Sequence, residues 1–408
     1  MLFSINLSHF EPKEQAMKFN TKVIHECQGV DPVTLAHVSP IYQTSTYVLP
    51  DYAAAVEANK PGDPGFHYSR TKHPSEYELS CKLAALEQTE AAVSCASGLG
   101  AISLVSMNLL SAGDHFVFGD VVYGCTHTLF TKVLPKFGVD YTIVDMKDPE
   151  AVRKALQPNT KMVYVETPSN PTLKCVDIQT ISDIAHTQEG ITVVADNTFA
   201  TPFNTNPTKH GADVVVHSLT KYLCGHGTVV AGVVCGTEEF ILSCRAPYLQ
   251  TLGSTIDPFA AWLVMQGLKT FAVRMERHGE NAMKIAEYLQ NHPKVEKVYY
   301  PGLTTHPSHD IAKKQMRTFG AMMSADIRGG MEGAATLMDN VRVFGLATSL
   351  GTVDSLIQHS PVMSHAGMTP EARHAVEIYD NQVRISVGLE DVDDLIDDLD
   401  QALKLIRL

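Results

Sequence analysis

The residues best suited to carry out a reaction lie in the segment 217–222, at the end of the apolar run 213–217. Lys221 closes a Ser-Leu-Thr-Lys sequence here, and a lysine at the end of a buried strand is partly desolvated. Desolvation lowers the pKa of the ammonium group and supplies the neutral amine that forms an imine with a carbonyl compound. Ser218 and Thr220 add hydroxyl groups within reach of a phosphate. Taken alone, this motif is equally consistent with a surface lysine after a strand.

Two further segments carry groups that suit an anionic, aromatic ligand. Asp196 follows the apolar run 192–195, and a carboxylate fixed there pairs with a protonated ring nitrogen. Ser97, Gly98 and Leu99 open an apolar helix, whose first N–H groups favour an anion. The turn lacks the GxGxxG pattern and a Walker lysine, which argues against dinucleotide and ATP sites. Each segment also has an ordinary structural interpretation, as a helix cap or a strand-to-helix turn.

Two segments elsewhere hold candidate aromatic and cationic groups. Tyr123 lies in a loop where its ring can stack on a flat cofactor and its hydroxyl can donate a proton. Tyr68 and Arg70 lie in an irregular region, and an arginine there can bind a phosphate with two parallel hydrogen bonds. Outside this context, the loop tyrosine is an ordinary packing residue and the arginine a solvated surface group. His306 and His309 have no third ligand at a recognisable spacing, so no metal site is expected.

The elements that must position these residues follow an α/β pattern. Leu79, Leu83 and Leu86 recur on one face of a helix after Ser75, which stands at capping-box spacing from Glu78. Short apolar runs then alternate with helical stretches, which predicts a mostly parallel sheet covered by helices on both faces. The expected strands are 91–94, 115–118, 162–165, 192–195, 213–217 and 229–235. In such sheets, sites form where the strands end.

The chain is expected to divide into three parts. Residues 1–72 form an irregular, proline-interrupted arm that packs on a neighbouring subunit, 73–272 a cofactor-binding domain and 273–408 a smaller α/β domain. Further strands are expected at 295–299, 321–327 and 382–387. The last helix carries leucines on one side, and its acidic side is interpreted as solvated: Asp393, Asp394, Asp397 and Asp398.

Composition limits the class of protein. The chain has 408 residues and a net charge of −13, which argues against a nucleic-acid-binding protein. No signal peptide or membrane-spanning run is recognisable, so a cytoplasmic protein is expected. The eight cysteines show no framework spacing and are interpreted as reduced, mostly buried thiols.

The order of these segments resembles the cystathionine γ-synthase, cystathionine γ-lyase and methionine γ-lyase family of fold-type I pyridoxal-phosphate (PLP) enzymes. The resemblance runs from about residue 41 to residue 388, which covers most of the chain. It rests on five motifs in order: Tyr68-Ser69-Arg70, Glu166-Thr167-Pro168-Ser169-Asn170-Pro171, Asp196-Asn197-Thr198, Ser218-Leu219-Thr220-Lys221 and Ser349-Leu350-Gly351. It implies a fold-type I PLP enzyme acting on an amino acid, assembled as a tetramer of two active dimers.

The resemblance also implies a role for each matching residue. Lys221 would hold PLP as a Schiff base, Asp196 would bind the pyridine nitrogen and Tyr123 would stack on the ring. The phosphate would be held by Ser97, Gly98, Leu99, Ser218 and Thr220, together with Tyr68 and Arg70 from a neighbouring subunit. The substrate carboxylate would be bound by Asn170, Ser349 and Arg384.

The resemblance points to γ-elimination on L-methionine. Cys125 matches methionine γ-lyases, whereas the related enzymes usually carry glycine there, and Thr348 replaces a glutamate usual in cystathionine γ-lyases. Tyr123 would protonate the departing thiolate, with its pKa lowered by Arg70 and the phosphate. Leu99 departs from the usual methionine. Alternatives are cystathionine γ-lyase or γ-synthase, O-acetylhomoserine sulfhydrylase, and a catalytically silent PLP-binding protein, against which the complete residue set argues.

Overall fold

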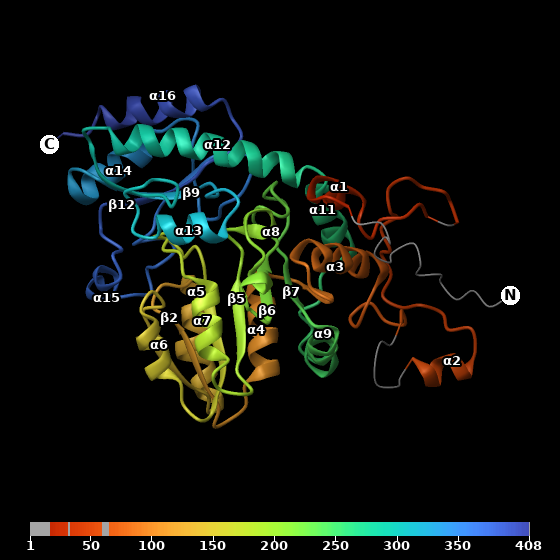
Figure 1. The fold of residues 1–408 in the computed structure, drawn as a ribbon. Coiled ribbons are helices and arrows are strands. Elements are labelled where there is room, and N and C mark those ends of the chain that lie inside the picture. The colour runs from red at the N-terminus through yellow and green to blue at the C-terminus, as the bar shows by residue number, and fades with distance from the viewer. Residues whose placement is uncertain (1–16, 32, 59–64, 408) are drawn as a thin grey trace.

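A mixed seven-stranded sheet forms the centre of the molecule (Figure 1). The structure is a computed structural model that describes residues 17–31, 33–58 and 65–407. The strand order is β1-β7-β6-β5-β4-β2-β3, and only β7 runs against the other six strands. The strands are β1 (Ala91–Cys95), β2 (His115–Gly119), β3 (Asp140–Val144), β4 (Thr160–Glu166), β5 (Thr192–Asp196), β6 (Val214–Ser218) and β7 (Gly232–Gly236). The predicted mostly parallel sheet is therefore confirmed.

Both faces of this sheet are buried because successive side chains of a strand point to opposite sides. Phe116 and Phe118 of β2 join one apolar cluster with helix α4 (Gly98–Leu109). Val117, between them, joins a second cluster with α6 (Pro149–Ala155) and α7 (Ile178–Ala185). No strand was predicted at β3, because this edge strand leaves its side chains partly exposed and has no continuous apolar run.

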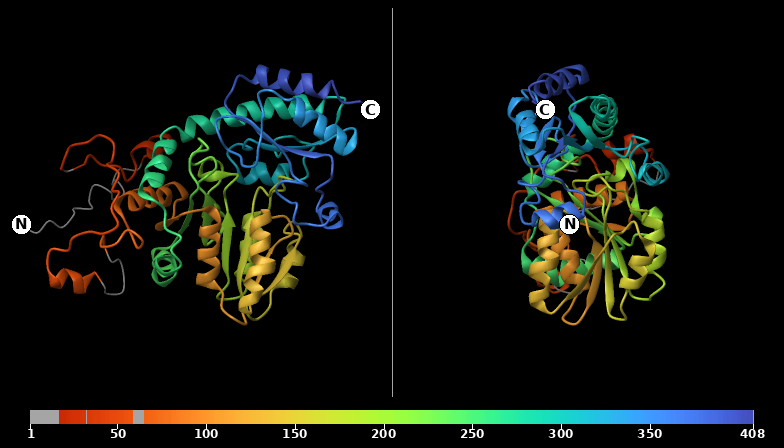
Figure 2. Two further views of the ribbon diagram at one scale, coloured as in Figure 1. Left: turned by 180° about the vertical axis from the view of Figure 1, so that it is seen from behind. Right: turned by 90° about the vertical axis from the view of Figure 1, so that its left-hand side faces the viewer.

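The C-terminal part forms a second sheet of five strands, in the order β10-β11-β12-β9-β8. Its strands are β8 (Val295–Tyr299), β9 (Met322–Ile327), β10 (Gly345–Leu346), β11 (Leu356–His359) and β12 (Gln382–Ser386). Helices α12 (Phe271–Gln290) and α16 (Val392–Leu403) cover it on the side away from the first sheet (Figures 1 and 2). The remaining helices of this part are α13 (His309–Gln315), α14 (Gly330–Asn340) and α15 (Pro370–Ala375). The predicted domain boundary at residue 273 falls inside α12, and the three-part division stays a prediction.

One acidic residue of α16 is not solvated as predicted. Leu395, Leu399 and Leu403 are buried as expected. Asp398, however, is only 4% exposed, and its carboxylate accepts hydrogen bonds from the backbone N–H groups of residues 342–344. The acidic side was therefore interpreted wrongly at this position, because a backbone turn far away in the sequence folds over it.

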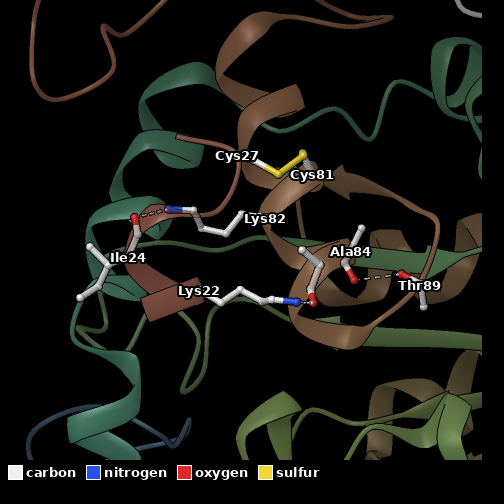
Figure 3. Close-up of a disulfide and its surroundings, with 8 residues drawn as sticks. Lys22, Ile24, Cys27, Cys81, Lys82, Ala84 and Thr89 are labelled. Atoms are coloured by element: carbon white, nitrogen blue, oxygen red, sulfur yellow. Dashed lines mark hydrogen bonds between the residues drawn. A yellow bond between two sulfur atoms is a disulfide. The ribbon is translucent and has the colours of Figure 1, made fainter. Parts of the chain in front are cut away.

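The N-terminal segment is tied to helix α3 (Pro74–Glu87) by a disulfide that the sequence analysis did not predict. Cys27 follows α1 (Phe19–His25) and bonds to Cys81 of α3, although 54 residues separate them (Figure 3). Lys22 and Lys82 donate hydrogen bonds between the same two segments (Figure 3). The interpretation of all cysteines as reduced is therefore wrong for this pair. The other six cysteines are free.

The start of α3 differs from the capping box that the sequence suggested. His73 is the N-cap, and its Nδ1 accepts the Glu76 backbone N–H at 3.1 Å. Ser75 Oγ instead accepts the backbone N–H of Tyr42, and Glu78 accepts the Ser39 hydroxyl at 2.7 Å. The two presumed capping residues therefore fasten the preceding arm to the helix. The short helix α2 (Tyr52–Glu57) of this arm lies apart from both sheets (Figures 1 and 2).

The remaining helices connect these layers. They are α5 (Gly124–Thr128), α8 (Thr201–Asn204), α9 (Glu238–Ser243), α10 (Gln250–Leu252) and α11 (Pro258–Leu268). No helix within the described ranges is long and apolar enough to cross a membrane.

Candidate functional site

A cavity of about 420 Å³ opens where β4, β5 and β6 end. Parallel strands present their carboxyl ends at one edge of a sheet, which brings residues far apart in the sequence together. The second sheet contributes the opposite wall, from β11, β12 and the loop before β11. The structure brings together these predicted site residues: Ser97, Gly98, Leu99, Tyr123, Cys125, Asn170, Asp196, Ser218, Thr220, Lys221, Ser349 and Arg384.

Lys221 lies in the turn that follows β6. Its Nζ donates a hydrogen bond to Ser349 Oγ at 2.9 Å, so the amine points to the wall that the second sheet supplies. Burial, followed by the charge of Arg384, lowers the pKa of Lys221 to about 8. About half of the amine is therefore neutral at pH 8, which is the form that attacks a carbonyl carbon.

Asp196 ends β5 and is held by two donors. The Tyr164 hydroxyl donates to Oδ2 at 2.9 Å, and the Thr198 backbone N–H donates to Oδ1 at 3.0 Å. Burial and the neighbouring Asp196 raise the pKa of Tyr164 well above its usual range, so the tyrosine keeps its proton and remains a donor. The Asp196 carboxylate is thereby fixed at the cavity wall as an acceptor.

The first turn of α4 offers an anion site on the same side. Ser97 is the N-cap, and its Oγ accepts the Gly100 N–H at 2.9 Å. Gly98 packs so closely on the end of β6 that a Cβ there would lie 2.8 Å from Ser218 Cβ. The free N–H groups and the dipole of this 12-residue helix favour a negatively charged ligand. The hydroxyl groups of Ser218 and Thr220 lie at the same wall.

Arg384, in β12, is 3% exposed and keeps its charge, since burial lowers its pKa only to about 10. Its guanidinium donates to Asn170 Oδ1 at 2.9 Å, to Ser349 O at 2.6 Å and to Gln358 Oε1 at 2.8 Å. Its Nε, in contrast, is a buried donor with no partner among the described residues. A carboxylate in the cavity would satisfy this donor and neutralise the buried cation.

Glu166 was not predicted as a site residue, although it lines the cavity and holds two other residues of its wall. It ends β4 beside Asp196 of β5, so the same strand-end rule would have found it. Its carboxyl accepts the backbone N–H groups of Tyr123 at 2.8 Å and of Asn170 at 3.1 Å. Burial and Asp196 raise the pKa of Glu166 well above its usual range. Tyr164 and Gln358 were also missed as partners of site residues; their contacts depend on tertiary packing, and no spacing indicates them.

Two predictions about Tyr123 and its partners stay open. Burial and then Cys125 raise the pKa of Tyr123 to about 12 in the single chain, and a lowering by the phosphate and by Arg70 of a neighbouring subunit stays a prediction. Arg70 bonds to Gln250 O, and neither it nor Tyr68 lines the cavity. Their reach into a neighbouring subunit stays a prediction.

The residues present fit PLP at three of its groups: the ring nitrogen, the aldehyde and the phosphate. An acceptor for the ring nitrogen, an amine with a lowered pKa and a helix N-terminus for the phosphate share one cavity. A mostly parallel sheet with this site at its carboxyl edge defines a PLP enzyme of fold type I. Within the described ranges, no group of three or more His, Cys, Asp or Glu residues is placed to hold a metal ion.

Comparison with known proteins gives the family. A family model described as Cys/Met metabolism PLP-dependent enzyme matches residues 20–404, and the chain belongs to this family. It is 47% identical to an L-methionine γ-lyase of Fusobacterium nucleatum, over 90% of this chain and 93% of the relative. It is 43% identical to a cystathionine γ-lyase of Bacillus subtilis, over 96% of this chain and 100% of the relative.

Solved structures agree with this membership. The structure of cystathionine γ-lyase from Lactobacillus plantarum, complexed with L-serine, is similar with a TM-score of 0.88 and 39% identity. The match covers 95% of this chain and 99% of that chain. The protein is therefore a PLP-dependent lyase of sulfur amino-acid metabolism.

Proposed function

We propose that this enzyme catalyses γ-elimination on L-methionine, with methanethiol, 2-oxobutanoate and ammonia as products. The Asp, Glu, Lys and Arg side chains that line the cavity, among the described residues, are Glu166, Asp196, Lys221 and Arg384. Each has a partner or a role in holding PLP or a single α-carboxylate. None is left for the second amino-acid head group of cystathionine, and this favours a substrate with an uncharged distal end. The similarity to methionine γ-lyases supports the same choice.

Binding of the substrate begins at Arg384. The free Nε–H donates to the α-carboxylate, while Asn170 and Gln358 hold the guanidinium in place through its other nitrogens. Charge-assisted hydrogen bonds of this kind are directional, so they fix the amino acid with its Cα–H near Lys221.

The proton transfers fall to Lys221 and Tyr123. Bound PLP supplies an electron sink that stabilises negative charge developing on the substrate carbons. Lys221 Nζ, positioned by Ser349 Oγ, removes the Cα proton and then shifts a proton from Cβ. Tyr123 stays protonated at neutral pH because its pKa is raised to about 12, so it acts as the acid that protonates the leaving methanethiolate.

Release of 2-oxobutanoate tests the proposed substrate. The PLP-loaded protein is assayed separately with L-methionine, L-cystathionine, L-homocysteine and O-acetyl-L-homoserine without added thiol, and Lys221→Ala serves as the inactive control. Fast release from methionine is expected. Turnover of cystathionine with little release from methionine would contradict the proposal. Consumption of O-acetylhomoserine only after a thiol is added would indicate a sulfhydrylase.

We also propose that the N-terminal arm completes the phosphate site of a neighbouring subunit in a homotetramer. The arm exposes large apolar side chains that a second copy would cover, and Val33, Val48 and Tyr52 are 86%, 98% and 84% exposed. Arg70→Ala and Lys221→Ala subunits, each inactive alone, should regain activity when mixed, because one mixed site carries both native residues. No recovery from subunits that do exchange would contradict the shared site.

A further inference from the structure

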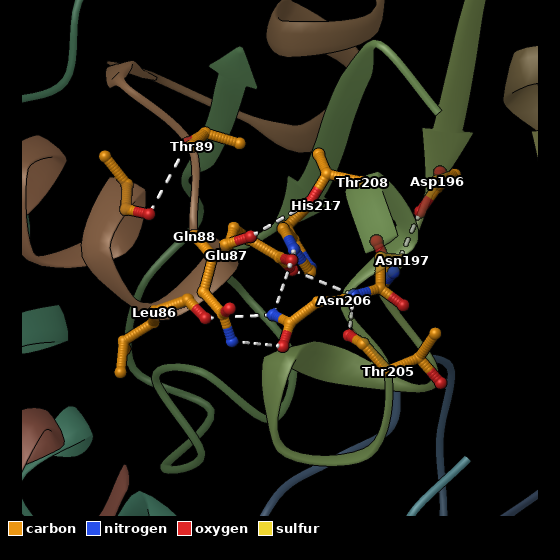
Figure 4. A network of polar contacts seen from close by, with 12 residues as sticks. Leu86, Glu87, Gln88, Thr89, Asp196, Asn197, Thr205, Asn206, Thr208 and His217 are labelled. Atoms are coloured by element: carbon orange, nitrogen blue, oxygen red, sulfur yellow. Dashed lines mark hydrogen bonds and ion pairs between the residues drawn. The ribbon is translucent and has the colours of Figure 1, made fainter. Parts of the chain in front are cut away.

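A buried polar network lies behind the cavity, at the end of α3 (Figure 4). Glu87, the last residue of α3, is 1% exposed, and His217 and Asn197 are 2% and 1% exposed. Glu87 Oε1 lies 2.5 Å from His217 Nε2 and accepts the Asn197 side-chain amide at 2.8 Å. Its second oxygen accepts the Asn206 amide at 3.2 Å. One carboxyl group therefore holds three segments that are far apart in the sequence.

The two strands that Glu87 joins are those that carry the proposed cofactor contacts. Asn197 directly follows Asp196, and His217 directly precedes Ser218. Because neighbouring side chains alternate between the faces of a strand, the network lies on the far side of the strand ends from the cavity. Beyond Asp196 the Asn197 N–H still donates to Val216 O, and the Ser218 N–H donates to Thr198 Oγ1. Glu87 Oε1 adds the link between the side chains of Asn197 and His217.

The stability of the fold alone does not account for the buried carboxyl group of Glu87 at this position. Burying an ionisable side chain is expensive, and apolar residues of similar size are often equally stable or more stable in such positions. The network is also incompletely satisfied, because His217 Nδ1 is buried without a partner among the described residues. Buried hydrogen bonds rigidify the segments that they join, so the contacts of Glu87 restrain Asn197, Asn206 and His217 relative to one another.

We propose that Glu87 is a positioning residue for PLP: by holding Asn197 and His217, it fixes Asp196 against the ring nitrogen and Ser218 against the phosphate. The inference rests on the roles proposed above for Asp196 and Ser218. It does not depend on which amino acid the enzyme cleaves, since it concerns binding of the cofactor in the absence of substrate.

The test measures PLP binding rather than turnover. Protein freed of PLP is titrated with PLP, and the dissociation constant, the absorbance spectrum of the bound cofactor and the melting temperature without cofactor are recorded. Glu87→Leu removes the acceptor, and Glu87→Gln keeps an acceptor oxygen. Asn197→Ala removes one of the two links, together with the hydrogen bond of this amide to Thr205 O. The matched control is Asp398→Asn, which alters another buried carboxylate that accepts backbone N–H groups and does not line the cavity.

Glu87→Leu and Asn197→Ala should each weaken PLP binding about tenfold or more, the loss that one broken buried contact produces. Both should shift the absorbance of bound PLP, and Glu87→Gln should bind more tightly than Glu87→Leu. Asp398→Asn should lower the melting temperature with wild-type PLP affinity. Wild-type affinity and spectrum in either variant would overturn the inference and leave the network a purely structural one. If Glu87→Leu does not fold, Asn197→Ala decides the question by the same criteria.

Discussion

Replacement of Arg384 by lysine tests how the substrate carboxylate is bound. Three of the five guanidinium N–H groups already donate to Asn170, Ser349 and Gln358, which leaves Nε–H and one Nη1–H for the substrate. A lysine ammonium has three N–H donors for these three protein acceptors and the carboxylate together, so at least one hydrogen bond is lost. A hydrogen bond to a charged group contributes about 1.5–3 kcal/mol, which corresponds to a fall in kcat/KM of about 10- to 150-fold.

The assay compares L-methionine with L-methionine amide, which lacks the carboxylate charge. The wild-type enzyme should strongly prefer the free acid, and Arg384→Lys should lose most of that preference while binding PLP as the wild type does. The loss should be much smaller with the amide, because that substrate never formed the charged contact. An equal loss on both substrates would refute the reasoning, because the variant would then have damaged the site as a whole. Wild-type kcat/KM on both substrates would exclude Arg384 as the carboxylate ligand.

Three further predictions follow from the cavity and the N-terminal segment. The pKa of Lys221 is lowered to about 8, so the neutral amine becomes dominant above that pH. The rate of PLP addition to the cofactor-free enzyme should therefore rise about tenfold per pH unit below pH 8 and level off above it. Gly98→Ala should weaken PLP binding, because the new Cβ would lie 2.8 Å from Ser218 Cβ and overpacking of this kind costs about 1–3 kcal/mol. The Cys27–Cys81 disulfide predicts that six thiols of the unfolded chain react without reductant and that eight react after reduction. Because the disulfide closes a loop of 54 residues, its reduction should lower the free energy of unfolding by about 4 kcal/mol.

Each of these predictions has its own contrary result. A rate profile with its midpoint near 10.5, the ordinary value for lysine, would show that Lys221 is not desolvated. Gly367→Ala is the control for Gly98→Ala, since a Cβ at that position meets no atom within 4 Å, and an equal effect of both would exclude the close-packing argument. Eight reactive thiols without reductant would show that the disulfide does not form.

Much of the fold was readable from the sequence, because local patterns determine where a strand or helix begins and ends. Continuous apolar runs predicted β2, β4, β5 and β6, whose side chains are buried on both faces. The strand β3 was not predicted, because its side chains at the edge of the sheet are partly exposed and form no continuous apolar run. Helix α3 was recognised from its buried leucines, but its start was misplaced because Ser75 and Glu78 make contacts to the arm that local spacing cannot reveal.

The sequence by itself determined the family and the candidate site residues: a lysine and an aspartate at strand ends and a glycine turn at a helix start. Only the tertiary structure decided how they act on one another. The lowered pKa of Lys221 needs the charge of Arg384, which is 163 residues further along the chain, as well as burial. The raised pKa of Tyr123 and the pairing of Glu166 with Asp196 likewise come from elements that meet only after folding. Burial, dielectric environment and through-space charge depend on three-dimensional proximity, and sequence order does not encode that proximity directly.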